Sequence, residues 1–156
     1  MIGERVFIDT NVLVYLYDND TPTKKARAVE LLRDELAPTN IVLSTQVLQE
    51  FFVAVTRKLA TPLQYSAATA ALEQLSVLSV RVVTTSLIVA AGTRCAHSML
   101  SFWDALIVET ALDAGATVLL TEDLQHHQKF GTLLVKNPFL AEPSTPLKSS
   151  PNTQSN

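Results

Sequence analysis

Short runs of consecutive hydrophobic residues alternate along this chain with longer segments in which hydrophobic positions recur every three or four residues. The short runs are typical of strands buried on both faces of a parallel sheet, and the longer segments are typical of amphipathic helices. The predicted strands cover residues 6–8, 41–43, 80–83, 118–120 and 133–135, the last at an edge of the sheet. The predicted helices cover residues 12–17, 24–36, 44–59, 62–75, 86–97 and 101–114. Strands that alternate with helices predict an α/β fold with a mainly parallel central sheet.

Residues at the ends of these segments support the predicted boundaries. Pro22 and Pro62 are expected in the first turns of the second and fourth helices. Ser44 and Ser101 are suitable N-caps for the third and sixth helices. Gly115 is the residue expected just beyond the C-terminus of the sixth helix.

The composition indicates one folded domain followed by a polar tail. The chain has 156 residues, of which 47% are hydrophobic, and this suffices for one domain with a substantial core. From Glu142 onward almost no residue is hydrophobic, and Pro, Ser, Thr and Asn dominate. We therefore predict a domain over residues 1–140 and a disordered tail over residues 141–156.

Cysteine content and hydropathy predict a soluble cytoplasmic protein without membrane association. Cys95 is the only cysteine, so an intramolecular disulfide is impossible, and we interpret it as a small core residue. No signal peptide is expected, because the N-terminus enters a strand-like run within a few residues. The apolar stretch at 78–91 is interrupted by polar residues and is too short to span a membrane.

The net charge of −3 and the pI of about 5.5 provide no global positive field of the kind that attracts nucleic acid. This acidity argues against a passive RNA-binding protein. It does not argue against a metal-dependent nuclease, because the site of such an enzyme must be acidic to hold its ion. An RNA substrate would then need bound cations and a local basic patch to offset the charge of the protein.

Four acidic residues are expected at one edge of the predicted sheet. Asp9 directly follows the first strand, and Asp123 follows the fourth strand by three residues. Asp104 lies in the first turn of its helix. Glu50 lies further along its helix, with a side chain that leans back toward the helix N-terminus. Because strand C-termini and the N-termini of the returning helices share one edge, the four carboxylates can converge.

Each of these acids also has an ordinary structural explanation. Asp9 can cap the next helix, and Asp104 can complete a capping box with Ser101. Asp123 can be a turn residue. Glu50 can be a solvated helix residue, because it lies roughly 60° outside the hydrophobic stripe of its helix.

Asp104 gives the strongest physical indication of a site. Glu109, Thr110 and Asp113 define the polar face of its helix, and Asp104 lies about opposite them, on the face predicted to be buried. A buried Asp is rare unless it is paired or bound to a cation. A capping role alone would not require that face.

The types of residue in this cluster indicate the metal and the chemistry. Carboxylates that crowd together repel unless a cation neutralises them, and oxygen-only ligands favour Mg²⁺ or Mn²⁺. Such an ion can activate water and polarise a phosphate, which is the chemistry of phosphodiester hydrolysis. Zinc is disfavoured, because His97 stands alone and the adjacent His126 and His127 are expected to point in different directions. We interpret these histidines as structural or surface groups.

Two other enzyme classes lack their motifs in this chain. No G-x-S-x-G elbow of a Ser-His-Asp hydrolase is present, and no G-x-x-x-x-G-K segment of a P-loop. With four glycines, the chain has little material for a Gly-rich phosphate cradle.

Taken together, these stretches resemble PIN-domain nucleases, and specifically the VapC-type toxins of bacterial toxin–antitoxin pairs. The matching segments are 7–13 (FIDTNVL), 46–51 (QVLQEF), 101–107 (SFWDALI), 119–124 (LLTEDL) and 137–139 (NPF). Each motif is weak by itself, but their common order and spacing over the folded part is specific.

The resemblance implies a single Rossmann-like α/β/α sandwich that cleaves RNA with Mg²⁺ or Mn²⁺ at a single-stranded region or at a loop of tRNA or rRNA. By position, Asp9 and Asp104 would be the principal metal ligands. Glu50 would help to hold the metal or position the attacking water, and Asp123 would complete the acidic cluster. Thr121 would bond a carboxylate or a substrate phosphate.

The family also implies a homodimer and a cognate antitoxin that blocks the site. Asn11 would either brace the pocket or stabilise the turn after the first strand. The candidate phosphate contacts, each of which can equally belong to a solvated helix face, are Lys24, Lys25, Arg27, Arg57 and Lys58.

Three alternatives remain open on the sequence. A PIN-family nuclease for RNA processing or DNA flaps would use the same carboxylates, without an antitoxin gene beside its own. An acidic-pocket phosphoreceiver of signalling also clusters Asp residues at strand ends, but its early paired acids are absent and Lys136 is the only candidate for its lysine. A degenerate binding module is disfavoured by the presence of all four acids.

Overall fold

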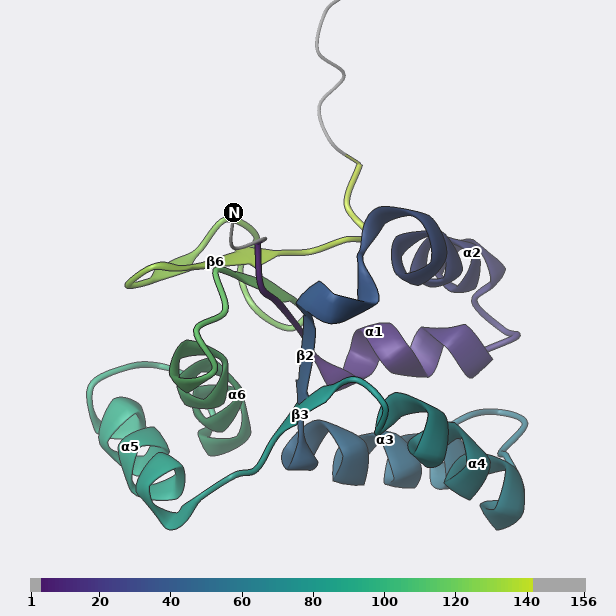
Figure 1. Ribbon diagram of the computed structural model, residues 1–156, viewed down its shortest axis with the longest axis horizontal. Helices are drawn as coiled ribbons and strands as arrows, with labels where there is room; N and C mark the ends of the chain where they lie inside the picture. Colours follow the sequence, from purple (N-terminus) through teal and green to yellow (C-terminus); the bar gives the residue numbers. More distant parts are fainter. Residues whose placement is uncertain (1–3, 142–156) are drawn as a thin grey trace, which may run out of the picture.

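The computed structural model describes residues 4–141 of the chain, which form a central sheet between two groups of helices (Figure 1). The strands are β1 (Val6–Ile8), β2 (Ile41–Ser44), β3 (Ser79–Arg81), β4 (Val118–Leu120), β5 (Lys129–Phe130) and β6 (Leu133–Lys136). They lie in the order β3-β2-β1-β4-β6-β5. All neighbouring strands are parallel except β5 and β6, which are antiparallel.

Six α-helices flank the sheet. They are α1 (Thr10–Val14), α2 (Pro22–Glu30), α3 (Thr45–Arg57), α4 (Tyr65–Leu75), α5 (Thr85–Ala96) and α6 (Phe102–Asp113). Short turns extend α1 as a 3₁₀ helix (Tyr15–Tyr17) and α2 as a π-helix (Leu31–Glu35), and a further 3₁₀ turn (Pro38–Asn40) precedes β2. Helices α5 and α6 lie together on one side of the sheet, and α1 to α4 lie on the other (Figure 1). None of the helices in residues 4–141 is long and apolar enough to cross a membrane.

The three central strands are buried along their whole length. Every residue of β1, β2 and β4 is inaccessible or nearly so, as expected for parallel strands covered by helices on both faces. Phe7, Leu43 and Leu119 are fully buried and belong to one continuous hydrophobic core. This core holds the C-terminal ends of β1 and β4 rigidly.

The register of β1 against β4 determines where the polar residues after these strands lie. Ile8 pairs with Leu120, and the backbone N–H of Asp9 donates to the carbonyl of Leu120 at 3.0 Å. Asp9 and Thr121 therefore emerge side by side. The strand order also reverses direction between β1 and β4, which is where α/β sheets commonly bind ligands.

Several predicted features are present in the structure. The strands at 6–8 and 118–120 have the predicted limits. Pro22 opens α2, and the hydroxyls of Ser44 and Ser101 accept from the backbone N–H groups three residues later. Gly115 follows α6 with a φ of 71°, in the left-handed region that a glycine adopts easily.

Several predictions about these elements were wrong. The third strand covers Ser79–Arg81 rather than residues 80–83. The strand at 133–136 is not at the edge, because the two-residue strand β5 turns back through Gly131 and pairs outside it. Helix α4 begins at Tyr65 rather than at Pro62. The segment before it folds back on α3, where the N–H of Leu63 donates to the carbonyl of Val55 at 2.8 Å. Most of the predicted tail, residues 142–156, lies outside the described residues.

Candidate functional site

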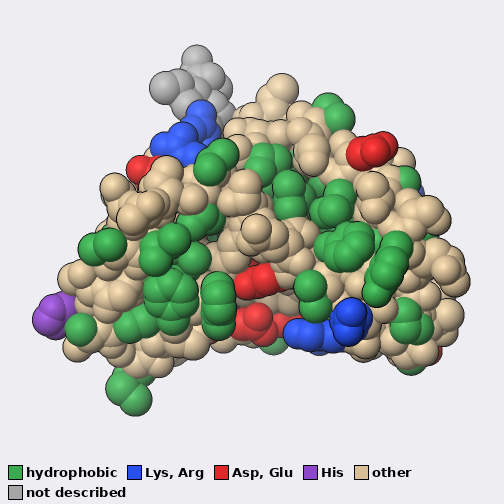
Figure 2. Space-filling model, turned by 90° about the horizontal axis from the view of Figure 1, so that it is seen from below, with side chains coloured by type: hydrophobic (Ala, Val, Ile, Leu, Met, Phe, Trp, Pro, Cys, Tyr) green, Lys and Arg blue, Asp and Glu red, His purple; other side chains and the backbone are tan. Residues whose placement is uncertain are grey.

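The four predicted acids line one cavity at the C-terminal edge of the sheet. The cavity has a volume of about 760 Å³, and its lining includes Asp9, Glu50, Asp104 and Asp123. Figure 2 shows acidic side chains near the middle of the face toward which the strands point, with hydrophobic side chains on either side. No Lys, Arg or His within residues 4–141 forms an ion pair with any of the four acids.

Asp9 is the most deeply buried of the four, with 5% of its surface exposed. It caps α1, and its Oδ1 accepts from the backbone N–H of Thr10 at 2.7 Å. Its Oδ2 accepts from the hydroxyl of Thr121 at 2.8 Å. Burial is the main cause that raises the pKa of Asp9 to about 7; the two hydrogen bonds oppose this shift, and the nearby charges of Asp123 and Glu50 add to it. The site therefore holds a carboxylate whose negative charge lacks a compensating cation.

Asp104 lies in the first turn of α6 and is only partly buried. Its pKa is raised, first by burial and then by the charges of Asp123 and Glu50, although the hydrogen bond with Ser101 lowers it. The prediction that Asp104 lies on a buried face, opposite a polar one, was therefore wrong in part. Thr110 of the supposed polar face is fully buried, and its hydroxyl is satisfied there by donating to the carbonyl of Leu106 at 2.7 Å. Because other elements cover helix α6 around most of its circumference, its residues do not divide into one polar and one buried face.

Glu50 is held in place by two residues that sequence reasoning did not identify. Its Oε2 accepts from the hydroxyl of Thr10 and its Oε1 from Nε2 of Gln46, each at 2.8 Å. Nε2 of Gln46 also donates to the backbone carbonyl of Trp103 at 3.2 Å. The i,i+4 spacing of Gln46 and Glu50 on one helix was the available signal for the first contact. The contact with Thr10 crosses 40 positions of sequence and had none.

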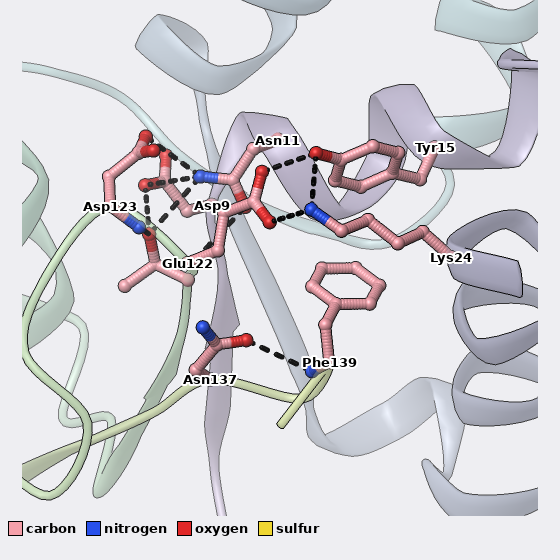
Figure 3. A network of polar contacts seen from close by, with 9 residues as sticks. Asp9, Asn11, Tyr15, Lys24, Glu122, Asp123, Asn137 and Phe139 are labelled. Atoms are coloured by element: carbon pink, nitrogen blue, oxygen red, sulfur yellow. Dashed lines mark hydrogen bonds and ion pairs between the residues drawn. The ribbon is translucent and has the colours of Figure 1, made fainter. Parts of the chain in front are cut away.

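Asn11 both braces the pocket and stabilises the loop after β4 (Figure 3). Its Nδ2 donates to Oδ2 of Asp123 at 2.9 Å and to the hydroxyl of Thr121 at 3.2 Å. Its Oδ1 accepts from the N–H of Glu122 at 3.4 Å. The Thr121 hydroxyl also accepts from the N–H of Asp123 at 3.1 Å. Thr121 and Asn11 thus connect Asp9 to Asp123, so Asn11 braces the pocket, and the loop that it stabilises is the one after β4.

Glu122 is a fifth acid beside the cluster, and it is neutralised by a lysine (Figure 3). Nζ of Lys24 donates to its Oε2 at 2.8 Å and to the hydroxyl of Tyr15 at 3.1 Å. Tyr15 in turn donates to Oε1 of Glu122 and packs edge-on against Phe139 with ring centroids 4.9 Å apart. The network fastens α2 and the segment after β6 to the loop that carries Asp123. No sequence pattern predicts this network, since Lys24 and Glu122 are 98 positions apart.

The five candidate phosphate contacts differ in what their side chains contact in the structure. Lys24 pairs with Glu122, and Lys25 bonds the side chain of Asn19 at 2.6 Å. Arg27 pairs with acids of its own helix and the following turn. Of the five, Lys58 alone lines the acidic cavity.

The histidines and the cysteine lie outside the cavity. His126 and His127 do not point apart as predicted, because their rings stack with centroids 3.7 Å apart. The left-handed backbone of His127, with a φ of 67°, accompanies this arrangement. Nδ1 of His126 accepts from the N–H of Asn137 at 3.0 Å, which is a structural role. Cys95 is partly buried and packs against the small cluster between α5 and α6.

The four carboxylates suit a hard divalent cation by their chemistry, although their present side-chain positions do not enclose one. Within the described part of the chain, no three Asp, Glu, His or Cys side chains gather closely enough to hold a metal ion. Glu50 is turned toward Thr10 and Gln46, and Asp123 toward Asn11. A bound ion would draw these carboxylates in by exchanging such hydrogen bonds for metal–oxygen bonds. The donors are all oxygen atoms and lack a protein cation, which fits Mg²⁺ or Mn²⁺.

Several solved structures share this fold. The sarcin-ricin loop cleaving toxin VapC20 of Mycobacterium tuberculosis superposes with a TM-score of 0.60 at 23% identity, over 73% of this chain and 86% of that one. DNA-bound VapBC of Salmonella typhimurium gives a TM-score of 0.60 at 18% identity, over 87% and 99%. FitAcB of Neisseria gonorrhoeae gives 0.59 at 19% identity, over 86% and 98%. At identities this low, these superpositions establish the shared fold alone.

Sequence comparison places the chain in a family. No curated protein matches it closely enough to count as a relative. The family model of the PIN domain, however, matches residues 6–130, which include β1, β4 and all four acids. The match and the shared fold exclude the phosphoreceiver alternative. The chain belongs to the PIN domain family.

Proposed function

We propose that this protein is an endoribonuclease that hydrolyses RNA phosphodiester bonds with Mg²⁺ or Mn²⁺. The observation that carries the proposal is the group of four carboxylates in one cavity, none of them ion-paired with a protein cation. Carboxylates crowded in this way are stable as anions only when a cation joins them. The nucleases of the PIN family meet this requirement with a divalent metal ion.

In the proposed site, Asp9 and Asp104 would be the principal ligands of the ion, with Glu50 and Asp123 completing the shell. When bound, the ion would supply charge neutralisation and an activated water for attack on phosphorus. The protein's own contribution is orientation. The Thr121 hydroxyl holds Oδ2 of Asp9 at 2.8 Å, so that the buried carboxylate keeps one direction.

The proposed biological role is that of the toxin of a type II toxin–antitoxin pair, acting in the cytoplasm as a homodimer. Three of the structural relatives, including FitAcB, are toxin–antitoxin assemblies from bacteria, and VapC20 is a toxin that cleaves the sarcin-ricin loop. By analogy, a cognate antitoxin would cover the acidic cavity. The RNA would present a single-stranded region or a loop of tRNA or rRNA to it.

The proposal is tested by incubating the purified protein with total RNA, with and without Mg²⁺ or Mn²⁺, and mapping the ends produced. We expect metal-dependent cleavage by the wild type and none by Asp104→Asn, because the variant keeps the size of the side chain but loses a charged ligand. Circular dichroism should show that the variant is folded. Cleavage at the wild-type rate by Asp104→Asn would rule out the assigned site. A DNA flap substrate in the same assay tests the flap-nuclease alternative.

The toxin role is tested separately by expression in a bacterial host. We expect growth arrest on induction, and relief when the gene beside this one is co-expressed. The Asp104→Asn variant, expressed at the same level, is the matched control and should be harmless. Normal growth with the wild type would contradict the toxin role while leaving the nuclease activity untouched.

A further inference from the structure

Trp103 stands at the rim of the acidic cavity with most of its ring exposed. Its relative exposure is 62%, and it lines the same cavity as the adjacent Asp104. Its ring meets Phe102 edge-on, with centroids 5.3 Å apart and planes at 74°. This contact leaves more than half of the surface of Trp103 exposed. A single exposed aromatic residue is ordinary on a protein surface, but one beside the carboxylates of a cavity faces whatever the cavity holds.

The backbone of Trp103 is tied to the acidic cluster. Nε2 of Gln46 donates both to the Trp103 carbonyl at 3.2 Å and to Oε1 of Glu50 at 2.8 Å. Gln46 is itself buried, with 4% of its surface exposed. The backbone of Trp103 is therefore held beside Glu50 by one buried side chain.

Lys58 supplies a positive charge at the end of the cavity away from Glu50. It follows the last residue of α3, whereas Glu50 lies in the middle of that helix, so the two are roughly 12 Å apart along the axis at 1.5 Å per residue. Both line the cavity, together with Val53 between them, whose exposure is 46%. Lys58 forms no ion pair with an acidic side chain of residues 4–141.

We propose that Trp103 and Lys58 form a binding track for single-stranded nucleic acid, in which Trp103 stacks on a base next to the scissile phosphate and Lys58 binds a phosphate further along the strand. The proposal rests on the nuclease function proposed above and adds residues that position the substrate. Stacking on an exposed aromatic ring and a cation beside the backbone are the two means by which proteins hold single strands. A double helix would not offer an unstacked base to Trp103.

The charges and the cavity favour a nucleic acid over a protein segment. The four carboxylates, once neutralised by a metal, attract a phosphate, and Lys58 attracts another at a distance that one strand can bridge. Val53 and Trp103 supply an apolar wall between these two ends, where a base can lie.

The chain has a single tryptophan, so its fluorescence reports directly on this site. The protein is titrated with a short single-stranded oligouridylate in Ca²⁺, and gel electrophoresis verifies that the strand stays intact. The strand should quench the tryptophan fluorescence, because a stacked base contacts the indole. Anisotropy of a labelled strand then gives the affinity of each variant. We expect Trp103→Ala to weaken binding roughly 5- to 150-fold and Trp103→Phe to retain most of it. Tyr65→Ala is the matched control, because Tyr65 is 60% exposed and does not line the cavity.

Lys58 is tested by the salt dependence of the same binding. Loss of one phosphate contact should reduce the slope of log K against log salt concentration by about 0.7 in Lys58→Met. Lys129→Met, which removes the same charge from the exposed strand β5, should leave the slope unchanged.

The outcomes separate this inference from the proposed function. If the wild type cleaves RNA but Trp103→Ala and Lys58→Met bind it as their controls do, the track is wrong and the nuclease assignment stands. Absence of quenching by a strand that binds would also overturn the role of Trp103. If the wild type neither binds nor cleaves RNA, both proposals fail.

Discussion

Asp9 shows at the scale of a single residue how the site opposes the stability of the fold. It is nearly inaccessible, and it is bonded by neutral donors from Thr10 and Thr121 rather than by a cation. Burial raises its pKa to about 7 for this reason, so near neutral pH its ionisation is unfavourable without a metal. The folded, metal-free protein therefore binds a proton at Asp9 more tightly than the unfolded chain does.

This difference gives a pH dependence with a definite sign. Because the folded pKa of about 7 exceeds the ordinary pKa of 3.8 for an Asp side chain, Asp9 stabilises the fold below pH 3.8, and this contribution is lost as the pH rises to about 7. In EDTA we expect Asp9→Asn to become progressively more stable than the wild type over that window, by on the order of 4 kcal/mol at most. Urea denaturation of both proteins across the pH range measures the difference. A difference that does not change with pH would show that Asp9 titrates normally.

At the scale of elements, the site depends on where strands β1 and β4 end and on which acids helices α3 and α6 carry. β1 and β4 end in register, which puts Asp9 beside Thr121. Helix α3 carries Glu50, and α6 carries Asp104 in its first turn. The start of α6 is therefore both a structural feature and a part of the site.

The cap of α6 provides a test of this dual role. Ser101→Ala removes the hydroxyl that accepts from the N–H of Asp104, and we expect a loss of about 1 kcal/mol in the free energy of unfolding. Cleavage should fall as well, because the first turn that positions Asp104 becomes less ordered. Thr84→Ala is the control, since the Thr84 hydroxyl caps α5 in the same way and lies away from the cavity. Equal cleavage by the two variants at equal stability would argue against a positioning role for the cap.

For the whole molecule, charge and shape together define where a cation can bind. The net charge is −3, and four of the acids face one cavity without an ion pair to any Lys, Arg or His of residues 4–141. A cation that binds the folded chain alone stabilises it by mass action.

We therefore expect Mg²⁺ at 100 times its dissociation constant to increase the free energy of unfolding by about 2.7 kcal/mol. Thermal melts with Mg²⁺ and with NaCl of the same ionic strength measure this effect. The double variant Asp9→Asn/Asp104→Asn should show no difference between the two salts. A similar Mg²⁺ effect in that variant would place the ion elsewhere.

The sequence alone was sufficient to predict the alternation of strands and helices, the caps at Ser44 and Ser101, and the edge at which four acids meet. These features are local, because a run of hydrophobic residues, a hydroxyl before a helix and the position of an acid after a strand all act within a few residues. Their positions at one edge then follow from the parallel topology.

Only the tertiary structure decided which acid is buried and which cations are free. Helical periodicity indicates which side of a helix is apolar but not which elements cover it. It therefore predicted a buried position for Asp104, whereas the most deeply buried of the four acids is Asp9. The pairing of Lys24 with Glu122, and the open position of Lys58 in the cavity, depend on contacts between distant segments. The sequence determined that four acids meet at one edge, and tertiary packing determined that no Lys, Arg or His of residues 4–141 forms an ion pair with them there.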